Sequence, residues 1–259
     1  MHRLGLGAMR IMQAGPEGAK ALLRRALELG VNLIDTADVY GRDGASERLI
    51  AEALRPYPDD LVIATKGGQV MGEGKPRADG RPDHLRSACE ASLRRLGLET
   101  IGLYQLHNAD PNVPLEESLG ALVDLRTEGK IRHIGVCNLF GQRLEQVLET
   151  TPVVTVQNRY NVLERATEQD LHLCERLGIA FVAYAPLGAG TLTAQDNLQR
   201  VADAHGATPA QTALSWLLHH SPIMLPIPGT ASIEHLEQNV AAGGLKLTGE
   251  EIADLESSC

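Results

Sequence analysis

Aromatic residues are scarce in this chain, where Phe, Trp and Tyr together make up 3% of 259 residues. The longest apolar runs, such as residues 213–218, fall far short of the roughly 20 residues that a membrane span requires. The four cysteines are scattered and form no C-x-x-C pair, so we expect reduced thiols. Residues 1–10 lack the apolar region of a signal peptide. These absences predict a soluble, cytoplasmic protein with no membrane partner.

Basic residues are outnumbered, with 24 Lys and Arg against 33 Asp and Glu and a formal net charge of −9. Binding to nucleic acid needs clustered Lys and Arg to neutralise phosphates, so this acidic balance argues against a nucleic-acid partner. The nine histidines form no H-x₃-H pattern and no Cys/His cluster. The sequence therefore predicts no metal site.

Short apolar runs alternate with segments of helical periodicity along the whole chain, without a linker or low-complexity stretch. Strands are expected at residues 3–9, 31–37, 61–66, 101–107, 131–138, 153–158, 179–186 and 223–229. Helices are expected at residues 17–29, 44–54, 83–96, 115–128, 140–149, 166–177, 196–205, 209–219 and 232–241, with a last helix capped at 248–251. We therefore expect residues 1–259 to form a single domain.

Eight β/α alternations with apolar strands indicate a parallel sheet covered by helices, which makes this an α/β protein. The alternative is a doubly wound open sheet, whose dinucleotide fingerprint lies in the first βα turn. The stretch Gly5–Met9 matches that fingerprint only in part, lacks its third glycine, and is not expected to start a helix. We therefore predict a (β/α)₈ TIM barrel, in which catalytic groups lie at the carboxyl ends of the strands.

Four polar residues of different chemistry follow three neighbouring strands of the predicted barrel: Asp35 and Tyr40, Lys66, and His107. A lysine cation near Tyr40 would stabilise the phenolate and lower the pKa of the phenol, and Asp35 would hold Lys66 charged and oriented. The phenol would then exchange a proton near neutral pH, while His107 positions a substrate oxygen or donates in its own right. This set suits a reaction in which a carbonyl oxygen gains negative charge.

The stretches NLIDTADVYG (32–41), LVIATKGG (61–68) and LYQLH (103–107) resemble the signature motifs of the aldo-keto reductase superfamily. The resemblance covers essentially the whole chain. It implies an NAD(P)H-dependent reduction of an aldehyde or ketone, with Tyr40 as general acid–base, Lys66 and Asp35 as its partners, and His107 as the residue that orients the substrate.

The same resemblance implies a nicotinamide cofactor held at the ends of the other strands. Asn138 matches a residue that binds the nicotinamide amide, Cys137 replaces a common serine before it, Gln157 matches a carboxamide contact, and Tyr184 matches the ring that stacks on nicotinamide. The full cofactor set implied is Met9, Asp35, Asn138, Gln157, Tyr184, Pro186, Leu187, Gly188, Pro228, Gly229, Thr230, Ser232, His235, Gln238 and Asn239.

The adenosine end departs from many relatives, which place a lysine and an arginine after the last strand to bind the 2′-phosphate of NADP. Here Gly229 and His235 occupy those positions, and no Lys or Arg occurs between Arg200 and Lys246. The phosphate would then rest on the helix N-terminus with Thr230 and Ser232. NADP(H) is favoured because the PGT-S pattern resembles NADPH-using bacterial members, and NAD(H) stays an alternative.

Two further expectations concern the substrate side. Residues 67–82, rich in Gly and charge, are expected to form a mobile rim loop that serves as a substrate lid. Because aromatics are few and the segment 188–197 is short, we expect an open, weakly walled site, completed by a second subunit or suited to a bulky polar substrate. The homo-oligomeric state stays open. So do two other functions: a nicotinamide-binding regulatory subunit without catalysis, and a redox-neutral lyase or isomerase.

Overall fold

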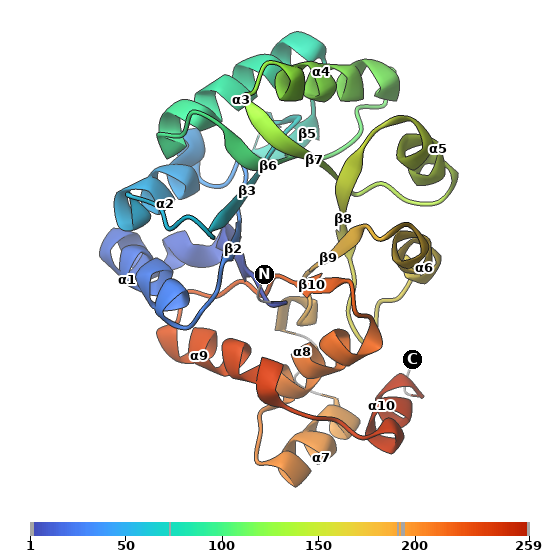
Figure 1. Ribbon diagram of the computed structural model, residues 1–259. Helices are drawn as coiled ribbons and strands as arrows, with labels where there is room; N and C mark the ends of the chain where they lie inside the picture. The colour runs from blue at the N-terminus through green and yellow to red at the C-terminus, as the bar shows by residue number, and fades with distance from the viewer. Residues whose placement is uncertain (1–2, 73, 191, 193–194, 258–259) are drawn as a thin grey trace.

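The computed structural model describes residues 3–72, 74–190, 192 and 195–257, and it shows eight parallel strands rolled into a barrel (Figure 1). Their order around the sheet is β1-β2-β3-β6-β7-β8-β9-β10. The strands are β1 (Leu6–Gly7), β2 (Leu33–Asp35), β3 (Val62–Gly67), β6 (Ile101–Leu106), β7 (Ile131–Cys137), β8 (Val153–Arg159), β9 (Ala180–Tyr184) and β10 (Met224–Pro226).

The first and last strands close the barrel through backbone hydrogen bonds. The amide of Gly5 donates to the carbonyl of Pro226 at 3.0 Å, and that of Gly7 donates to the carbonyl of Pro228 at 3.1 Å. A Cβ atom at Gly7 would lie 2.7 Å from the carbonyl oxygen of Ile227, so this approach requires glycine. The predicted (β/α)₈ barrel is confirmed, and the doubly wound alternative is wrong.

An outer ring of helices covers the strands (Figure 1). The helices are α1 (Gly15–Glu28), α2 (Ala45–Leu54), α3 (Pro82–Leu96), α4 (Leu115–Thr127), α5 (Gln142–Thr150), α6 (Glu168–Leu177), α7 (Asp196–His205), α8 (Pro209–His220), α9 (Ile233–Ala241) and α10 (Gly249–Glu256). Both α8 and α10 begin with capping boxes, at Thr208 and Thr248, and the second is the cap expected at 248–251. Within the described residues, no helix has the length and apolar character needed to cross a membrane.

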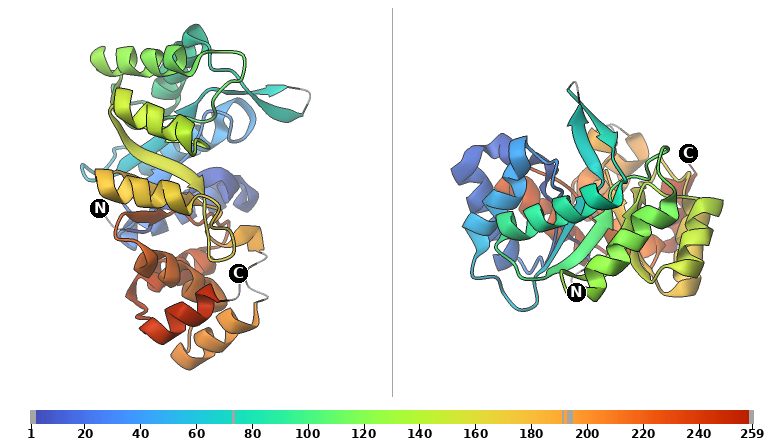
Figure 2. Two further views of the ribbon diagram at one scale, coloured as in Figure 1. Left: turned by 90° about the vertical axis from the view of Figure 1, so that its right-hand side faces the viewer. Right: turned by 90° about the horizontal axis from the view of Figure 1, so that it is seen from above.

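Two segments at the rim differ from the sequence prediction. The strand expected at 3–9 is only β1, because a 3₁₀ helix begins at Ala8 and runs to Ala14, where no helix was expected. The expected loop 67–82 contains an antiparallel hairpin, β4 (Gln69–Gly72) and β5 (Lys75–Ala78), that projects from the barrel (Figure 2). Residue 73 at its turn lies outside the described residues. Strands of four residues, half-buried in β4 and mostly exposed in β5, are too short to show a clear apolar pattern, so periodicity does not reveal them.

Side chains inside the barrel come from alternate positions of each strand. A small apolar cluster fills the interior: Leu33, Ala64, Leu103, Val182 and Ile227. Two residues further along β2, β3 and β6, towards their carboxyl ends, lie Asp35, Lys66 and Gln105, which therefore face the same interior. The larger apolar core, which includes Trp216 and Tyr104, lies between the strands and the helices.

A second group of buried polar side chains lies near β3, α2 and α3. Glu47 is fully buried and accepts hydrogen bonds from Thr65 Oγ1 at 2.6 Å and from Arg95 Nε at 2.5 Å. Asp38, in the loop after β2, has a buried Oδ1 atom with no hydrogen-bond partner among the described residues. Burial, reinforced by the negative charge of Glu47, raises the pKa of Asp38 to about 7.

We expect Asp38→Asn to increase the free energy of unfolding at pH 8 by at least about 1 kcal/mol, because the buried charge is removed. The pKa of Asp38 is raised in the folded state. The contribution of its protonated form to the free energy of unfolding is therefore fully present at low pH and is lost as pH rises through about 7. Chemical denaturation should therefore show little difference between variant and wild type near pH 4. Asp43, an exposed acid in the 3₁₀ helix Arg42–Gly44 that follows this loop, provides the control. Asp43→Asn should leave the free energy of unfolding unchanged at pH 8 and at pH 4.

Candidate active site

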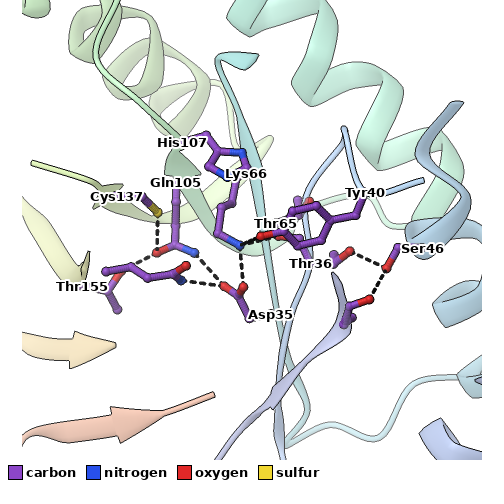
Figure 3. A network of polar contacts seen from close by, with 12 residues as sticks. Asp35, Thr36, Tyr40, Ser46, Thr65, Lys66, Gln105, His107, Cys137 and Thr155 are labelled. Carbon is purple, nitrogen blue, oxygen red and sulfur yellow. Dashed lines mark hydrogen bonds and ion pairs between the residues drawn. The ribbon is translucent and has the colours of Figure 1, made fainter. Parts of the chain in front are cut away.

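One large cavity opens at the carboxyl ends of the barrel strands, with a volume of about 920 Å³. It extends from Tyr40 and His107, beside β2 and β6, to His235 and Asn239 on α9. Of the predicted catalytic residues, Asp35, Tyr40 and His107 line it, and Lys66 lies fully buried beneath them (Figure 3). The predicted set is therefore brought together at one rim of the barrel.

A buried ion pair between Lys66 and Asp35 forms the floor of this cavity. Lys66 Nζ donates to Asp35 Oδ1 and to the carbonyl of Thr36 at 2.8 Å, and both charged side chains are at most 4% exposed. Burial alone would lower the pKa of Lys66, but the charge of Asp35 raises it above its ordinary value. Lys66 is therefore a permanent cation at this position.

Tyr40 lies next to this cation. Its Oη atom is 3.5 Å from Lys66 Nζ, and its ring meets that of His107 edge to face at a centroid distance of 5.9 Å. Burial raises the pKa of Tyr40 and outweighs the opposing charge of Lys66, while the nearby Asp35 and Cys137 raise it further. The sequence predicts that Lys66 lowers the pKa of this phenol to near neutrality. For the residues of this chain by themselves that prediction is wrong, because the pKa of Tyr40 is raised.

His107 is held in its neutral form. Burial and the neighbouring Lys66 cation lower its pKa to about 3. Its Nδ1 atom is buried and has no hydrogen-bond partner among the described residues. A buried ring nitrogen without a partner at a cavity wall leaves a place for an oxygen or N–H of a bound molecule.

Two residues with left-handed backbone mark the ends of β7 and β9 at the cavity wall. Asn138 has φ +54° and Ala185 has φ +49°, which is uncommon for residues other than glycine and typical of functional sites. Asn138 Oδ1 accepts a hydrogen bond from Tyr184 Oη at 2.8 Å, and its Nδ2 donates to the carbonyl of His107 at 3.1 Å. Asn138 thereby links the wall at Tyr184 to the catalytic rim.

Gln157, implied by the resemblance to contact a cofactor, lines the cavity, and its amide donates to Asp35 Oδ2 at 2.7 Å. A second amide, Gln105, donates to the same oxygen at 3.1 Å. Gln105 was not predicted, although a polar residue within the apolar strand LYQLH is a signal that could have identified it. Asp35 is therefore held by one cation and two amides.

The far end of the cavity contains most of the residues implied for the adenosine part of a cofactor. Thr230, His235, Gln238 and Asn239 line it, whereas Gly188 and Ser232 do not. The Ser232 hydroxyl accepts a hydrogen bond from the His235 backbone amide at 3.3 Å and thereby caps α9. The implied residues that line the cavity are Met9, Asp35, Asn138, Gln157, Tyr184, Pro186, Leu187, Pro228, Gly229, Thr230, His235, Gln238 and Asn239.

The wall on the substrate side includes residues that sequence reasoning did not assign. Met71 and Pro76 pair across the β4–β5 hairpin and reach the cavity from the same face. Arg10 and Arg159 also line it, as do residues 208–210 at the start of α8. The hairpin thus contributes Gln69, Met71 and Pro76 to the wall of the cavity. Residues 191, 193 and 194, in the segment expected to leave the site open, lie outside the described residues.

Comparison with known proteins agrees with this arrangement. The sequence model of the Aldo/keto reductase family matches residues 3–258. An uncharacterized oxidoreductase of Schizosaccharomyces pombe is 42% identical over 265 residues, covering 99% of this chain and 86% of its own. Pyridoxine 4-dehydrogenase of Escherichia coli is 38% identical over 270 residues, covering 99% and 94%. The crystal structure of an aldo-keto reductase from Klebsiella pneumoniae in complex with NADPH has a TM-score of 0.86 at 33% identity, covering 99% of this chain and 90% of that one. The chain belongs to the aldo/keto reductase family.

Proposed function

We propose that this protein reduces an aldehyde or ketone to an alcohol with NADP(H) as the cofactor and Tyr40 as the proton donor. The observation that carries the proposal is the convergence of Asp35, Lys66, Tyr40 and His107 at one end of a single cavity. For a developing alkoxide, Tyr40 supplies a proton and His107 a neutral hydrogen-bonding ring. Lys66, held by Asp35, supplies a nearby cation.

The cavity suits a nicotinamide dinucleotide in size and in the chemistry of its walls. Tyr184 and Asn138 lie near the catalytic rim, and Pro228, Gly229 and Thr230 lead from there to His235 on α9. Backbone amides near a helix N-terminus favour phosphate groups. The related Klebsiella pneumoniae enzyme was crystallised with NADPH. A reduced nicotinamide bound here would supply the hydride that a carbonyl carbon accepts.

The residues of this chain would then handle the oxygen of the carbonyl. His107 stays neutral because burial and the Lys66 cation suppress protonation of its imidazole. This neutral ring holds the carbonyl oxygen beside Tyr40. The Tyr40 hydroxyl donates its proton to the oxygen as negative charge develops there. Lys66, 3.5 Å from the phenol oxygen, stabilises the phenolate that remains. Asp35 keeps Lys66 in place.

Tyr40→Phe should lower kcat/KM for carbonyl reduction by roughly a thousandfold, because general acid catalysis contributes about 10²–10⁴-fold. The assay follows loss of NADPH absorbance with a panel of aldehydes and ketones, and NADPH affinity is measured separately by fluorescence. The affinity should stay within about twofold, since the ring is retained.

Tyr57→Phe is the matched control, because that phenol donates to the carbonyl of Leu96 and lies outside the cavity lining. It should leave kcat/KM unchanged. Full activity of Tyr40→Phe would refute the assignment of the proton donor. Tight NADPH binding by the wild type without turnover of any carbonyl would instead favour a regulatory subunit.

His235→Arg should tighten NADPH binding about tenfold and leave NADH binding unchanged, because a guanidinium binds phosphate with two hydrogen bonds. His235 is exposed, lines the adenosine end of the cavity and has the acid Glu234 beside it. Dissociation constants for both cofactors come from fluorescence titration. His172→Arg makes the same change on α6, away from the cavity, and controls for added charge. An equal gain for NADH and NADPH would argue against a 2′-phosphate site at His235.

A further inference from the structure

Gln105 is a fully buried amide in the centre of the catalytic floor, and no part of the mechanism above uses it. It lies on β6, directly opposite Lys66 of β3 in the strand register. Its Nε2 atom donates to Asp35 Oδ2 at 3.1 Å, while Lys66 donates to the other oxygen of the same carboxylate (Figure 3). Gln105 and Lys66 therefore hold Asp35 from two sides.

The orientation of the Gln105 amide is fixed by the groups on its other side. Thr155 Oγ1 donates to Gln105 Oε1 at 3.3 Å, and Cys137 Sγ donates to the same oxygen at 3.7 Å. Turning the amide over would place its oxygen against the Asp35 carboxylate and its NH₂ group against the two donors. Such a contact is unfavourable on both sides, so the NH₂ group faces Asp35.

The contact between Gln105 and Thr155 requires a glycine on the strand between them. Gly135 of β7 pairs with Gln105 on one side and with Thr155 on the other. A Cβ atom there would lie 2.2 Å from Thr155 Oγ1 and 2.8 Å from Gln105 Cγ. Thr155 and Gln105 therefore meet across β7 in the space that Gly135 leaves open.

We propose that Gln105 is a positioning residue for the catalytic tyrosine, acting through Asp35 and Lys66, and held in place by Thr155, Cys137 and Gly135. This role rests on the proposed function only in taking Tyr40 as the proton donor. Gln105 itself does not line the cavity. Its amide presents its positive end to the catalytic floor and holds the carboxylate at a fixed distance from Lys66.

The consequence for Tyr40 follows from the charges around it. Four titratable groups face Tyr40 from the packed elements: Asp35, Lys66, His107 and Cys137. The Asp35 charge raises the pKa of Tyr40, and the Lys66 charge lowers it. The Gln105 donor offsets part of the Asp35 charge. Loss of that donor lets Asp35 act more strongly on both Lys66 and Tyr40, which makes the phenol a weaker acid.

Gln105→Met is the sharpest test, because methionine has nearly the same size and shape but provides no N–H donor. We expect kcat for carbonyl reduction to fall about fivefold, the loss expected for one hydrogen bond. The alkaline limb of the pH profile should move up by about half a pH unit. KM and the dissociation constant for NADPH should stay unchanged, since Gln105 does not line the cavity.

Three further variants separate positioning from packing. Tyr104 is the buried residue next to Gln105 on the same strand, and its hydroxyl has no partner among the described residues. Tyr104→Phe should therefore leave kcat and the pH profile unchanged. Thr155→Val removes a donor to Gln105 and should give a smaller change of the same kind as Gln105→Met. Gly135→Ala should reproduce the pH shift of Gln105→Met, because its methyl group displaces the amide.

A titration that needs no turnover keeps this proposal distinct from the proposed function. Ultraviolet difference spectra follow phenolate formation with pH, and subtracting the Tyr40→Phe variant isolates the signal of Tyr40. An upward shift in Gln105→Met relative to wild type supports the positioning role even if no carbonyl substrate is turned over. An unshifted Tyr40 titration, or a loss of kcat without a shift of the pH profile, would overturn it.

Discussion

The buried ion pair between Lys66 and Asp35 is the interaction on which the site depends. Two charges inside a barrel are costly unless each is paired and its remaining hydrogen-bonding capacity is satisfied. Asp35 meets this condition by accepting from Lys66, Gln105 and Gln157, which come from three different strands. The Asp35 carboxylate therefore links β2 to three other strands, β3, β6 and β8. It also fixes where the positive charge of Lys66 lies.

The position of that charge determines the state of its neighbours. Burial lowers the pKa of His107, and the Lys66 cation lowers it further. The same cation partly opposes the effect of burial on the pKa of Tyr40. Because Lys66 is fully buried, solvent screens these effects weakly. The same charges at a protein surface would change both groups much less.

Much of the architecture could be predicted because strand periodicity and helix caps are local properties of the sequence. Asp35, Lys66 and His107 were recognisable since each lies at the carboxyl end of an apolar run. The role of Gln105 was not, because its partners lie 70 residues before and up to 50 residues after it in the chain and meet it only through strand register. The requirement for glycine at position 135 likewise depends on side chains of the two flanking strands.

The two ends of the cavity are constrained to different degrees. At the end near Tyr40, contacts between strands tie Asp35 to Lys66, Gln105 and Gln157, so one substitution changes several groups together. At the adenosine end, the described residues near α9 are a capping serine, an exposed imidazole and the acid Glu234, with Gln238 donating to that acid at 3.3 Å. These contacts stay within α9 and its cap and reach none of Asp35, Lys66 or Tyr40. A substitution at the exposed His235 should therefore act independently of that other end. Under the proposed function, a single substitution at His235 can therefore change cofactor preference without disturbing the proposed proton transfer from Tyr40.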